Sequence, residues 1–310
     1  MIFAGLPGGT MRHVLSVSDW RREDIRWILS RACEWKSAHR PVTCLRAPRG
    51  ALILERPALR TRIAYESAMH LLGGSLTVFD SGVGTSDSID DVGRVLSGML
   101  DIAFIRTRSH AMLEQLSKTA TIPIINVLSN REHPVEVLAD ALTIRDTFGN
   151  TEGRKIAFVG TAGNVCTSLL LLAPLLGMDA AVATPEGFAP SEDTLRQVRA
   201  LASSHGTGFM DTRSVEEAVR DADVVYTDGW PRLDDADEEE RLLGPYRVTP
   251  PVMAQASADA IFLHCLPAAR NREVTHDVLD SEQSYAFRRL ENLAPTSAAM
   301  IEWALECDSA

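Results

Sequence analysis

Short apolar runs alternate with amphipathic segments along most of the chain. From residue 50 onward, runs rich in β-branched residues have the length of strands, and the segments between them repeat apolar positions every three or four residues. The first predicted strands are 50–55, 75–79, 101–106 and 122–127. The helices predicted with them are 61–72, 88–100, one near 110–118, and 133–148. An earlier amphipathic helix is predicted over 22–36, with Ile25, Ile28, Leu29 and Ala32 on one face.

A second set of the same kind follows a polar, glycine-rich segment at 149–155. Its predicted strands are 155–160, 179–184, 206–210, 223–228 and 260–265. Its predicted helices are 164–176, 191–204 and 214–221, then an acidic loop with a short helix before the last strand, and a final helix over 294–306. Such alternation is typical of parallel sheets covered by helices on both faces.

The sequence therefore predicts an α/β fold with two doubly wound parallel-sheet domains and a cleft between them. We expect the domains at 1–148 and 149–295, and a C-terminal helix within 296–310 that returns to the first domain. Ligands of doubly wound folds bind outside the carboxyl ends of the strands, so the cleft is the expected site.

Composition and charge exclude several classes of function. The chain has 310 residues, 45% of them apolar and 24% charged, as in ordinary globular proteins. The net charge of −11, with no basic block, argues against nucleic-acid and membrane-surface partners. No apolar run approaches the roughly 18–20 residues of a membrane span. The first ten residues lack the basic region of a signal peptide, so we expect an extension with Met11 beginning the ordered chain.

The cysteines favour a reducing compartment. Their number is odd, they lie far apart, and no C-x-x-C motif occurs. They are Cys33, Cys44, Cys166, Cys265 and Cys307. We therefore expect a cytoplasmic protein without a disulfide framework.

Polar side chains gather where predicted strands of the first set end. Arg60 and Thr61 open the helix after strand 50–55, where backbone N–H groups and the helix dipole favour an anion. Arg106 ends the third strand, and His133 precedes Pro134 at a helix start. The alternatives are a solvated basic helix start and a histidine that only caps or packs. Donors converging on one sheet edge would suit a phosphate and a polarised carbonyl.

The stretch "FLHCLPAAR", residues 262–270, places His264 and Cys265 side by side at a strand end. A zinc site needs three or four ligands, and no second Cys/His pair has suitable spacing. A covalent Cys–His pair needs side chains that face each other, whereas neighbours along a strand point to opposite faces. We therefore interpret Cys265 as a binding contact, with a buried structural cysteine as the alternative.

Several motifs together resemble the aspartate/ornithine carbamoyltransferases. They are "RTR" after a strand, "HP" before an "LAD" helix, "VGTAGNVCTSLLLLAPLLG", "DVVYTDGW", "HCLP" and "SYAFRRLEN". Their order and spacing match that family from about residue 12 to residue 307. "HCLP" points to the ornithine branch, because the aspartate branch has His-Pro-Leu-Pro there.

The resemblance implies transfer of a carbamoyl group from carbamoyl phosphate to a small-molecule primary amine, without a cofactor or metal. The first domain would bind carbamoyl phosphate and the second the amine. The residues implied to bind carbamoyl phosphate are Arg60, Thr61, Arg106, His133 and Glu136. Those implied to bind the amine are Asn164, Asp228, Arg232, Leu233, Cys265 and Leu266. The catalytic residues would be Arg106, His133 and Cys265. A homotrimer, or a multiple of trimers, with sites at subunit borders is also implied.

The donor side departs from the family pattern. Ala58-Leu59 replace a Ser-Thr pair, Glu136 replaces a glutamine, and Leu293 replaces an arginine. Gly82 stands where the family has a glutamine lent to a neighbouring subunit. We expect weaker affinity for carbamoyl phosphate, since each lost polar contact is worth on the order of 1–3 kcal/mol.

The acceptor side departs further. The family's Asp-x-Trp-x-Ser-Met-Gly loop reads Asp-Gly-Trp-Pro-Arg-Leu-Asp at 228–234, and Thr161 replaces an aspartate. These changes predict an acceptor other than free ornithine. A candidate is a diaminopropionate-type amine in specialised-metabolite or peptide-antibiotic biosynthesis, because some members of the family carbamoylate amines of that type. The alternatives are an ordinary ornithine carbamoyltransferase, a non-catalytic anion-binding relative, and a nucleotide-dependent oxidoreductase, although "VGTAGN" lacks G-x-G-x-x-G.

Overall fold

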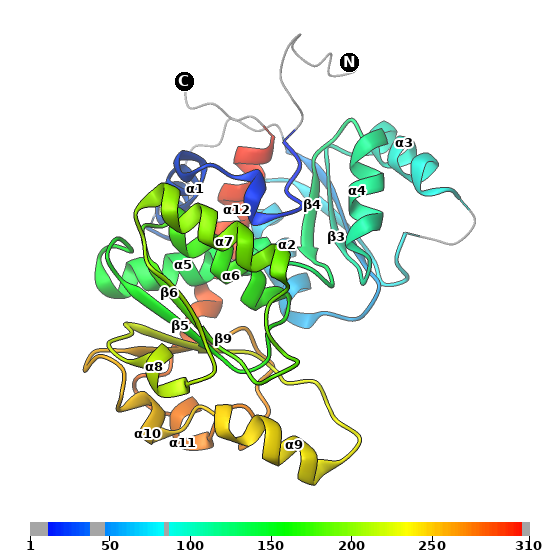
Figure 1. Cartoon of the computed structure of the whole chain (residues 1–310). Coiled ribbons are helices and arrows are strands. Elements are labelled where there is room, and N and C mark those ends of the chain that lie inside the picture. The colour runs from blue at the N-terminus through cyan, green and yellow to red at the C-terminus, as the bar shows by residue number, and fades with distance from the viewer. Residues whose placement is uncertain (1–11, 38–46, 84–86, 306–310) are drawn as a thin grey trace.

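Two parallel sheets organise the chain in the computed structural model, which describes residues 12–37, 47–83 and 87–305 (Figure 1). The strands of the first sheet are β1 (Arg49–Leu54), β2 (Ser75–Phe79), β3 (Ile102–Arg106) and β4 (Ile124–Leu128), in the order β2-β1-β3-β4. Those of the second are β5 (Lys155–Val159), β6 (Asp179–Ala183), β7 (Phe209–Thr212), β8 (Val224–Thr227) and β9 (Ile261–His264), in the order β7-β6-β5-β8-β9. All pairs of adjacent strands are parallel, which confirms the predicted fold class.

The helices connect the strands as predicted. The predicted ones are α1 (Arg22–Ser37), α2 (Leu59–Leu71), α3 (Ile89–Met99), α4 (His110–Thr119), α5 (Pro134–Phe148), α6 (Asn164–Leu175), α7 (Glu192–His205), α8 (Val215–Val219), α9 (Ala236–Leu243) and α12 (Leu293–Ala304). The sequence patterns missed α10 (Pro250–Met253), α11 (His276–Leu279), and the 3-10 turns η1 (Val17–Asp19), η2 (Gly244–Tyr246) and η3 (Arg288–Asn292). Elements this short carry no periodic pattern.

Several boundaries differ from the prediction by one to three residues, and two of these differences have a cause in the backbone conformation. Strand β7 begins at Phe209 instead of 206, because Gly206 takes a left-handed conformation with φ of 69° that ends α7. Helix α8 ends at Val219 instead of 221, and Asp221 has a φ of 58°, which a continuing helix does not allow.

Both faces are buried in the strands other than the edge strands β2 and β7, as their continuous apolar runs predict. In β1, Leu52 and Leu54 face one core while Ala51 and Ile53 face another. The first of these cores extends into the second domain, where it includes Phe158 of β5. Helices α5 and α6 pack against each other between the two sheets, so one apolar core joins the domains (Figure 1).

The C-terminal helix returns to the first domain, as expected. Helix α12 packs against α1, α2 and α5 (Figure 1). Its Glu302 is fully buried and accepts hydrogen bonds from Arg31 Nε at 2.7 Å and from Trp35 Nε1 at 2.9 Å. The helix starts at Leu293, one residue before the predicted 294–306, and residue 306 lies outside the described residues.

Other expectations fall partly outside the described residues. Cys33, Cys166 and Cys265 are free thiols, whereas Cys44, Cys307, and the N-terminal extension through Met11 lie outside. Among the described helices, none combines the length and the hydrophobicity that crossing a bilayer requires. The cytoplasmic location and the domain boundaries stay predictions.

Candidate functional site

The carboxyl edge of the first sheet collects the predicted donors. Strand β1 pairs with β2 on one side and β3 on the other, so the connection after β1 leads to one side of the sheet and the connection after β3 leads to the other. Arg60 and Thr61 lie in the first turn of α2, and Ala58 at its N-cap makes no side-chain capping bond, so that turn's N–H groups have no capping side chain. Arg106 Nη1 lies 3.5 Å from Thr61 Oγ1. Burial, and then the nearby Arg60 charge, lower the pKa of Arg106, but a guanidinium stays charged.

His133 and Glu136 form a pair at the start of α5. His133 precedes the helix with Pro134 at its first position, and Glu136 lies one turn on. His133 Nε2 is 3.2 Å from Glu136 Oε2, and Nδ1 has no hydrogen-bond partner among the described residues. Burial lowers the pKa of His133 to about 4, against the opposing charge of Glu136. The ring is therefore neutral at neutral pH, and the carboxylate beside Nε2 favours the single imidazole proton on that nitrogen.

A buried arginine stands behind this pair. Arg289 in η3 is fully buried, and its Nη2 lies 2.7 Å from Glu136 Oε1. Its Nε donates to Asp140, which also accepts from the Tyr226 hydroxyl at 2.9 Å. Burial acts to raise the pKa of Glu136, but the charge and the hydrogen bond of Arg289 hold it below its usual value. Arg289 was not identified in the sequence analysis. The signal for it was Glu136, because a carboxylate in place of the family's uncharged glutamine indicates that a cation lies close by.

The second domain contributes Asp228 and Cys265 from two neighbouring strand ends. Strands β8 and β9 pair with Thr227 opposite His264, so the residues that follow them are adjacent. Cys265 Sγ donates a hydrogen bond to Asp228 Oδ1 at 2.8 Å. Burial, and then the Asp228 charge, raise the pKa of the Cys265 thiol. Cys265 is therefore a neutral hydrogen-bond donor at neutral pH rather than a thiolate.

The geometric reason for separating His264 from Cys265 was wrong. Strand β9 ends at His264, so strand alternation does not extend to Cys265, and ligand atoms of Asp228, His264 and Cys265 all lie within 4.8 Å of one another. His264 Nδ1 accepts from the Leu266 N–H at 2.8 Å, and its Nε2 lies 3.4 Å from Glu273 Oε1. The imidazole is thus held by its own neighbours, and the expectation that these residues hold no metal stays a prediction.

The two domains meet at these strand ends. Arg60 Nη2 donates to the Leu266 carbonyl at 2.6 Å, which joins α2 to the segment after β9. Asn164, at the start of α6, donates to the Ser129 carbonyl at 2.7 Å, and its Oδ1 accepts from the Val165 N–H. Both ends of the Asn164 amide are therefore engaged, whereas its predicted partner in amine binding, Asp228, pairs with Cys265.

Arg272, which the sequence analysis also did not identify, holds the altered loop at 228–234 by hydrogen bonds. Arg272 donates to the carbonyls of Trp230 at 2.9 Å and Pro231 at 2.6 Å, and it pairs with Glu239 at 2.6 Å. Glu239 in turn accepts from the Leu233 N–H at 3.0 Å. Arg232 is exposed, and no acidic group among the described residues lies within ion-pair distance of it.

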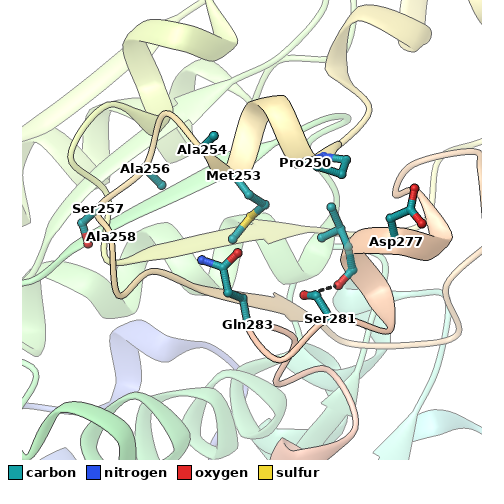
Figure 2. A pocket seen from close by; sticks show the side chains of 10 residues that line it. Pro250, Met253, Ala254, Ala256, Ser257, Ala258, Asp277, Ser281 and Gln283 are labelled. Carbon is teal, nitrogen blue, oxygen red and sulfur yellow. Dashed lines mark hydrogen bonds between the residues drawn. The ribbon is translucent and has the colours of Figure 1, made fainter.

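The expected cleft is narrow in this structure. A cavity of about 20 Å³, room for about one water, lies against the donors. It is lined by Thr61, Ala64, Tyr65, His133, Val135, Glu136, Leu293 and Ser297. Two of the substituted family positions, Glu136 and Leu293, thus line one space. A larger pocket of about 190 Å³ lies between α10 and α11 and the segment that leads into β9, at the opposite edge of the second sheet (Figure 2).

Comparisons with known proteins agree over almost the whole chain. The family model described as "Aspartate/ornithine carbamoyltransferase, carbamoyl-P binding domain" matches residues 12–146, and the one for the "Asp/Orn binding domain" matches residues 152–304. The chain is 39% identical to an ornithine carbamoyltransferase of Methanosphaera stadtmanae over 94% of this chain and 98% of that one. It is similar to the solved ornithine carbamoyltransferase of Pyrococcus furiosus, with a TM-score of 0.90, 35% identity, and coverage of 94% and 96%. The corresponding structure from Gloeobacter violaceus has a TM-score of 0.88, 34% identity, and coverage of 95% and 98%.

Proposed function

Because the chain belongs to the aspartate/ornithine carbamoyltransferase family, we propose that it transfers the carbamoyl group of carbamoyl phosphate to a primary amine other than free ornithine. Carbamoyl-phosphate-dependent transfer to an amine is the activity of the family. The observation that carries the choice of acceptor is Arg232, an exposed cation on a loop that Arg272 fastens in place.

Carbamoyl phosphate would bind at the carboxyl edge of the first sheet. Arg60, Thr61 and the open N–H groups of α2 would hold the phosphate, and its oxygens would compete with the Leu266 carbonyl for Arg60. Arg106 would donate to the carbonyl oxygen, where negative charge develops during the reaction. The Nε2–H of His133 would also donate to it, and the carbonyl oxygen would share this proton with Glu136.

The reaction asks for positioning and electrostatics. The lone pair of the amine nitrogen forms a bond to the carbonyl carbon, the bond from that carbon to the phosphate oxygen breaks, and phosphate leaves with the electron pair. The nitrogen loses a proton, which the departing phosphate can take. Cys265 and the Leu266 carbonyl would orient the amine, and the neutral thiol fits this role better than that of a covalent nucleophile.

Arg232 favours an acceptor whose carboxylate lies close to the transferred amine. It is longer than the family's serine at this position and carries a charge, so it would meet the carboxylate nearer to the reacting nitrogen. Asp228 would take a cationic amino group on the same molecule. A diaminopropionate-type amine has this short spacing, and such a group on a specialised metabolite or a peptide antibiotic would place the enzyme in antibiotic biosynthesis.

Steady-state kinetics with a series of amines tests the proposal. The acceptors are ornithine, 2,4-diaminobutyrate, 2,3-diaminopropionate and the methyl ester of the last, which lacks the carboxylate. We expect kcat/KM for diaminopropionate to exceed that for ornithine by at least about tenfold and to fall by about tenfold in Arg232→Ser, as for one charged hydrogen bond. Arg241→Ser, an exposed arginine on α9, is the matched control. Efficient citrulline formation by the unaltered enzyme would refute the choice of acceptor.

An ordinary ornithine carbamoyltransferase is the second candidate. The names of the similar proteins favour it, as does the Asp228–Cys265 pair, which lies where the resemblance puts the ornithine site. The same acceptor series decides between the two. A protein that binds carbamoyl phosphate and turns over none of these amines would instead support the non-catalytic alternative.

We further propose that the chain forms homotrimers, as the family resemblance implies. Large apolar side chains are exposed around the open edge of the first sheet, on α2 and β2: Leu59, Ile63 and Phe79. Burying them between subunits would remove this apolar surface from water. Light scattering should give about three times the monomer mass, and Phe79→Asp should lower it, whereas a monomeric parent protein would refute the assembly.

A further inference from the structure

Arg289 occupies an unusual place for a guanidinium. It is fully buried in η3, at the junction of the two domains, and it is the largest fully buried side chain among the described residues. Removing a charge from water is costly unless the charge is paired and hydrogen-bonded. Its partners are Asp140 and Glu136, both on α5 and one turn apart. The position therefore requires a reason beyond packing.

Three groups form a chain that ends at the carbamoyl site. Arg289 Nη2 contacts Glu136 Oε1 at 2.7 Å, while the other oxygen of the same carboxylate lies 3.2 Å from His133 Nε2. A carboxylate accepts hydrogen bonds only, so it fixes the imidazole proton on Nε2. A protonated Glu136 could donate instead, and His133 would then carry its proton on Nδ1, where no described residue accepts it.

We infer that Arg289 is a positioning residue for carbamoyl transfer, which keeps Glu136 ionised and thereby holds His133 as an Nε2–H donor for the carbamoyl oxygen. This rests on the proposed role of His133 and deepens it. Arg289 acts through Glu136 and needs no contact with the substrate. It also explains how a carboxylate is tolerated beside a site for a doubly charged anion, since the guanidinium neutralises it.

A purely structural role for Arg289 is the competing explanation. Its Nε–Asp140 contact ties η3 to α5, and Tyr226 completes that network from β8. The substitution Arg289→Gln separates the two roles. A glutamine amide nitrogen reaches about as far as the arginine Nε, so it can still donate to Asp140, but it has no charge and nothing that reaches Glu136.

Binding of phosphonoacetamide is the measurement. This stable compound carries an amide and a phosphonate in place of the carbamoyl and phosphate groups, so calorimetry follows the donor site without turnover. In Arg289→Gln, Glu136 loses the charge that keeps it ionised. We expect binding about 10- to 100-fold weaker at pH 6 and a gain in affinity as pH rises, because the carboxyl then ionises. The phosphonate itself ionises in this pH range, so the affinity of each variant is divided by that of the unaltered protein at the same pH, and it is this ratio that should rise with pH for Arg289→Gln.

The double variant Glu136→Gln/Arg289→Gln gives the deciding comparison. With no carboxyl left beside His133 to protonate, it should bind more tightly at pH 6 than Arg289→Gln. Asp140, whose pKa burial raises to about 6, remains in both variants, so its titration does not distinguish them. A structural role predicts no such rescue. The control is Arg154→Gln, which breaks a part-buried pair with Asp223 remote from the site; it should leave binding unchanged.

The outcomes separate this inference from the function it rests on. If the unaltered protein binds phosphonoacetamide, but Arg289→Gln binds equally well or the double variant shows no rescue, Arg289 is structural and the inference fails alone. If the unaltered protein neither binds phosphonoacetamide nor transfers a carbamoyl group, the proposed donor site fails and the inference with it. Circular dichroism of each variant establishes that a loss of binding is not a loss of fold.

Discussion

Replacing Asp228 by asparagine should make the Cys265 thiol more reactive toward alkylating reagents. Sγ donates to Asp228 Oδ1 at 2.8 Å, so ionising the thiol places two negative charges side by side. Burial and then the Asp228 charge raise the pKa of this thiol. Asparagine has the shape of aspartate and can still accept the thiol hydrogen bond, so the variant removes the charge and little else.

The contact distance sets the size of the effect. Two unit charges 2.8 Å apart repel by about 1.5 kcal/mol at the dielectric constant of water and by about 6 kcal/mol at an effective value of about 20. Because Cys265 is partly exposed, we take the lower energy as the minimum effect. It corresponds to about tenfold more thiolate in Asp228→Asn than in the unaltered protein. A less basic thiolate is also a weaker nucleophile, so the alkylation rate should rise by at least about three- to fourfold.

Iodoacetamide labelling at about pH 7.5, read by mass spectrometry of the Cys265 peptide, measures this rate. Partly exposed Cys33 is an internal reference in the same sample, and fully buried Cys166 should stay unmodified. An unchanged or slower rate in Asp228→Asn would contradict the electrostatic account. Labelling of the unaltered Cys265 as fast as an activated thiolate would show that it is not the neutral donor that the site requires.

Three further predictions follow from buried groups. Burial lowers the pKa of His133 to about 4, so this residue should not titrate between about pH 5.5 and 8. Over that range kcat/KM of the unaltered enzyme and of His133→Asn should have the same pH profile, with the variant lower by a factor of about 10²–10³. An inflection in the unaltered enzyme that is absent from the variant would refute this. Burial raises the pKa of Glu132, so the protonated side chain stabilises the fold at low pH, and this contribution is lost as pH rises through the pKa of the folded state. The free energy of unfolding in urea should therefore fall with rising pH in the unaltered protein, and Glu132→Gln should lack this part of the fall. Glu302→Ala should cost about 1–3 kcal/mol of unfolding free energy because it removes the fully buried acceptor of Arg31 and of the buried Trp35 N–H, whereas Glu34→Ala, at an exposed partner of the same arginine, should cost less than about 1 kcal/mol.

Much of the donor site could be predicted because its placement is local. Arg106 ends an apolar run, Arg60 and His133 open the helices that follow two others, and strands of one parallel sheet end at the same edge. The ladder and the right-handed crossover then bring the three ends together whatever the details of packing. Asp228 and Cys265 were predicted from the family resemblance alone, and the pairing of β8 with β9 makes the residues that follow these strands neighbours.

The strand alternation that placed His264 and Cys265 on opposite faces failed for a physical reason. It holds only while the backbone stays extended, and β9 ends at His264. The backbone then turns so far that Leu266 has a φ of 60°. The start of β7 after Gly206 and the end of α8 before Asp221 differ from the prediction for the same kind of reason, because left-handed residues interrupt a pattern that hydrophobic periodicity would continue.

The sequence by itself determined the nine strands, their two parallel sheets and the strand ends from which the polar groups emerge, because these depend on periodicity and on chain handedness. Only the tertiary structure decided which charges meet. Arg289 and Glu136 are 153 positions apart, and Arg272 and Glu239 are 33 apart, so no periodic pattern connects them. A buried charge must find a partner wherever the packing permits one, and that choice depends on the whole fold.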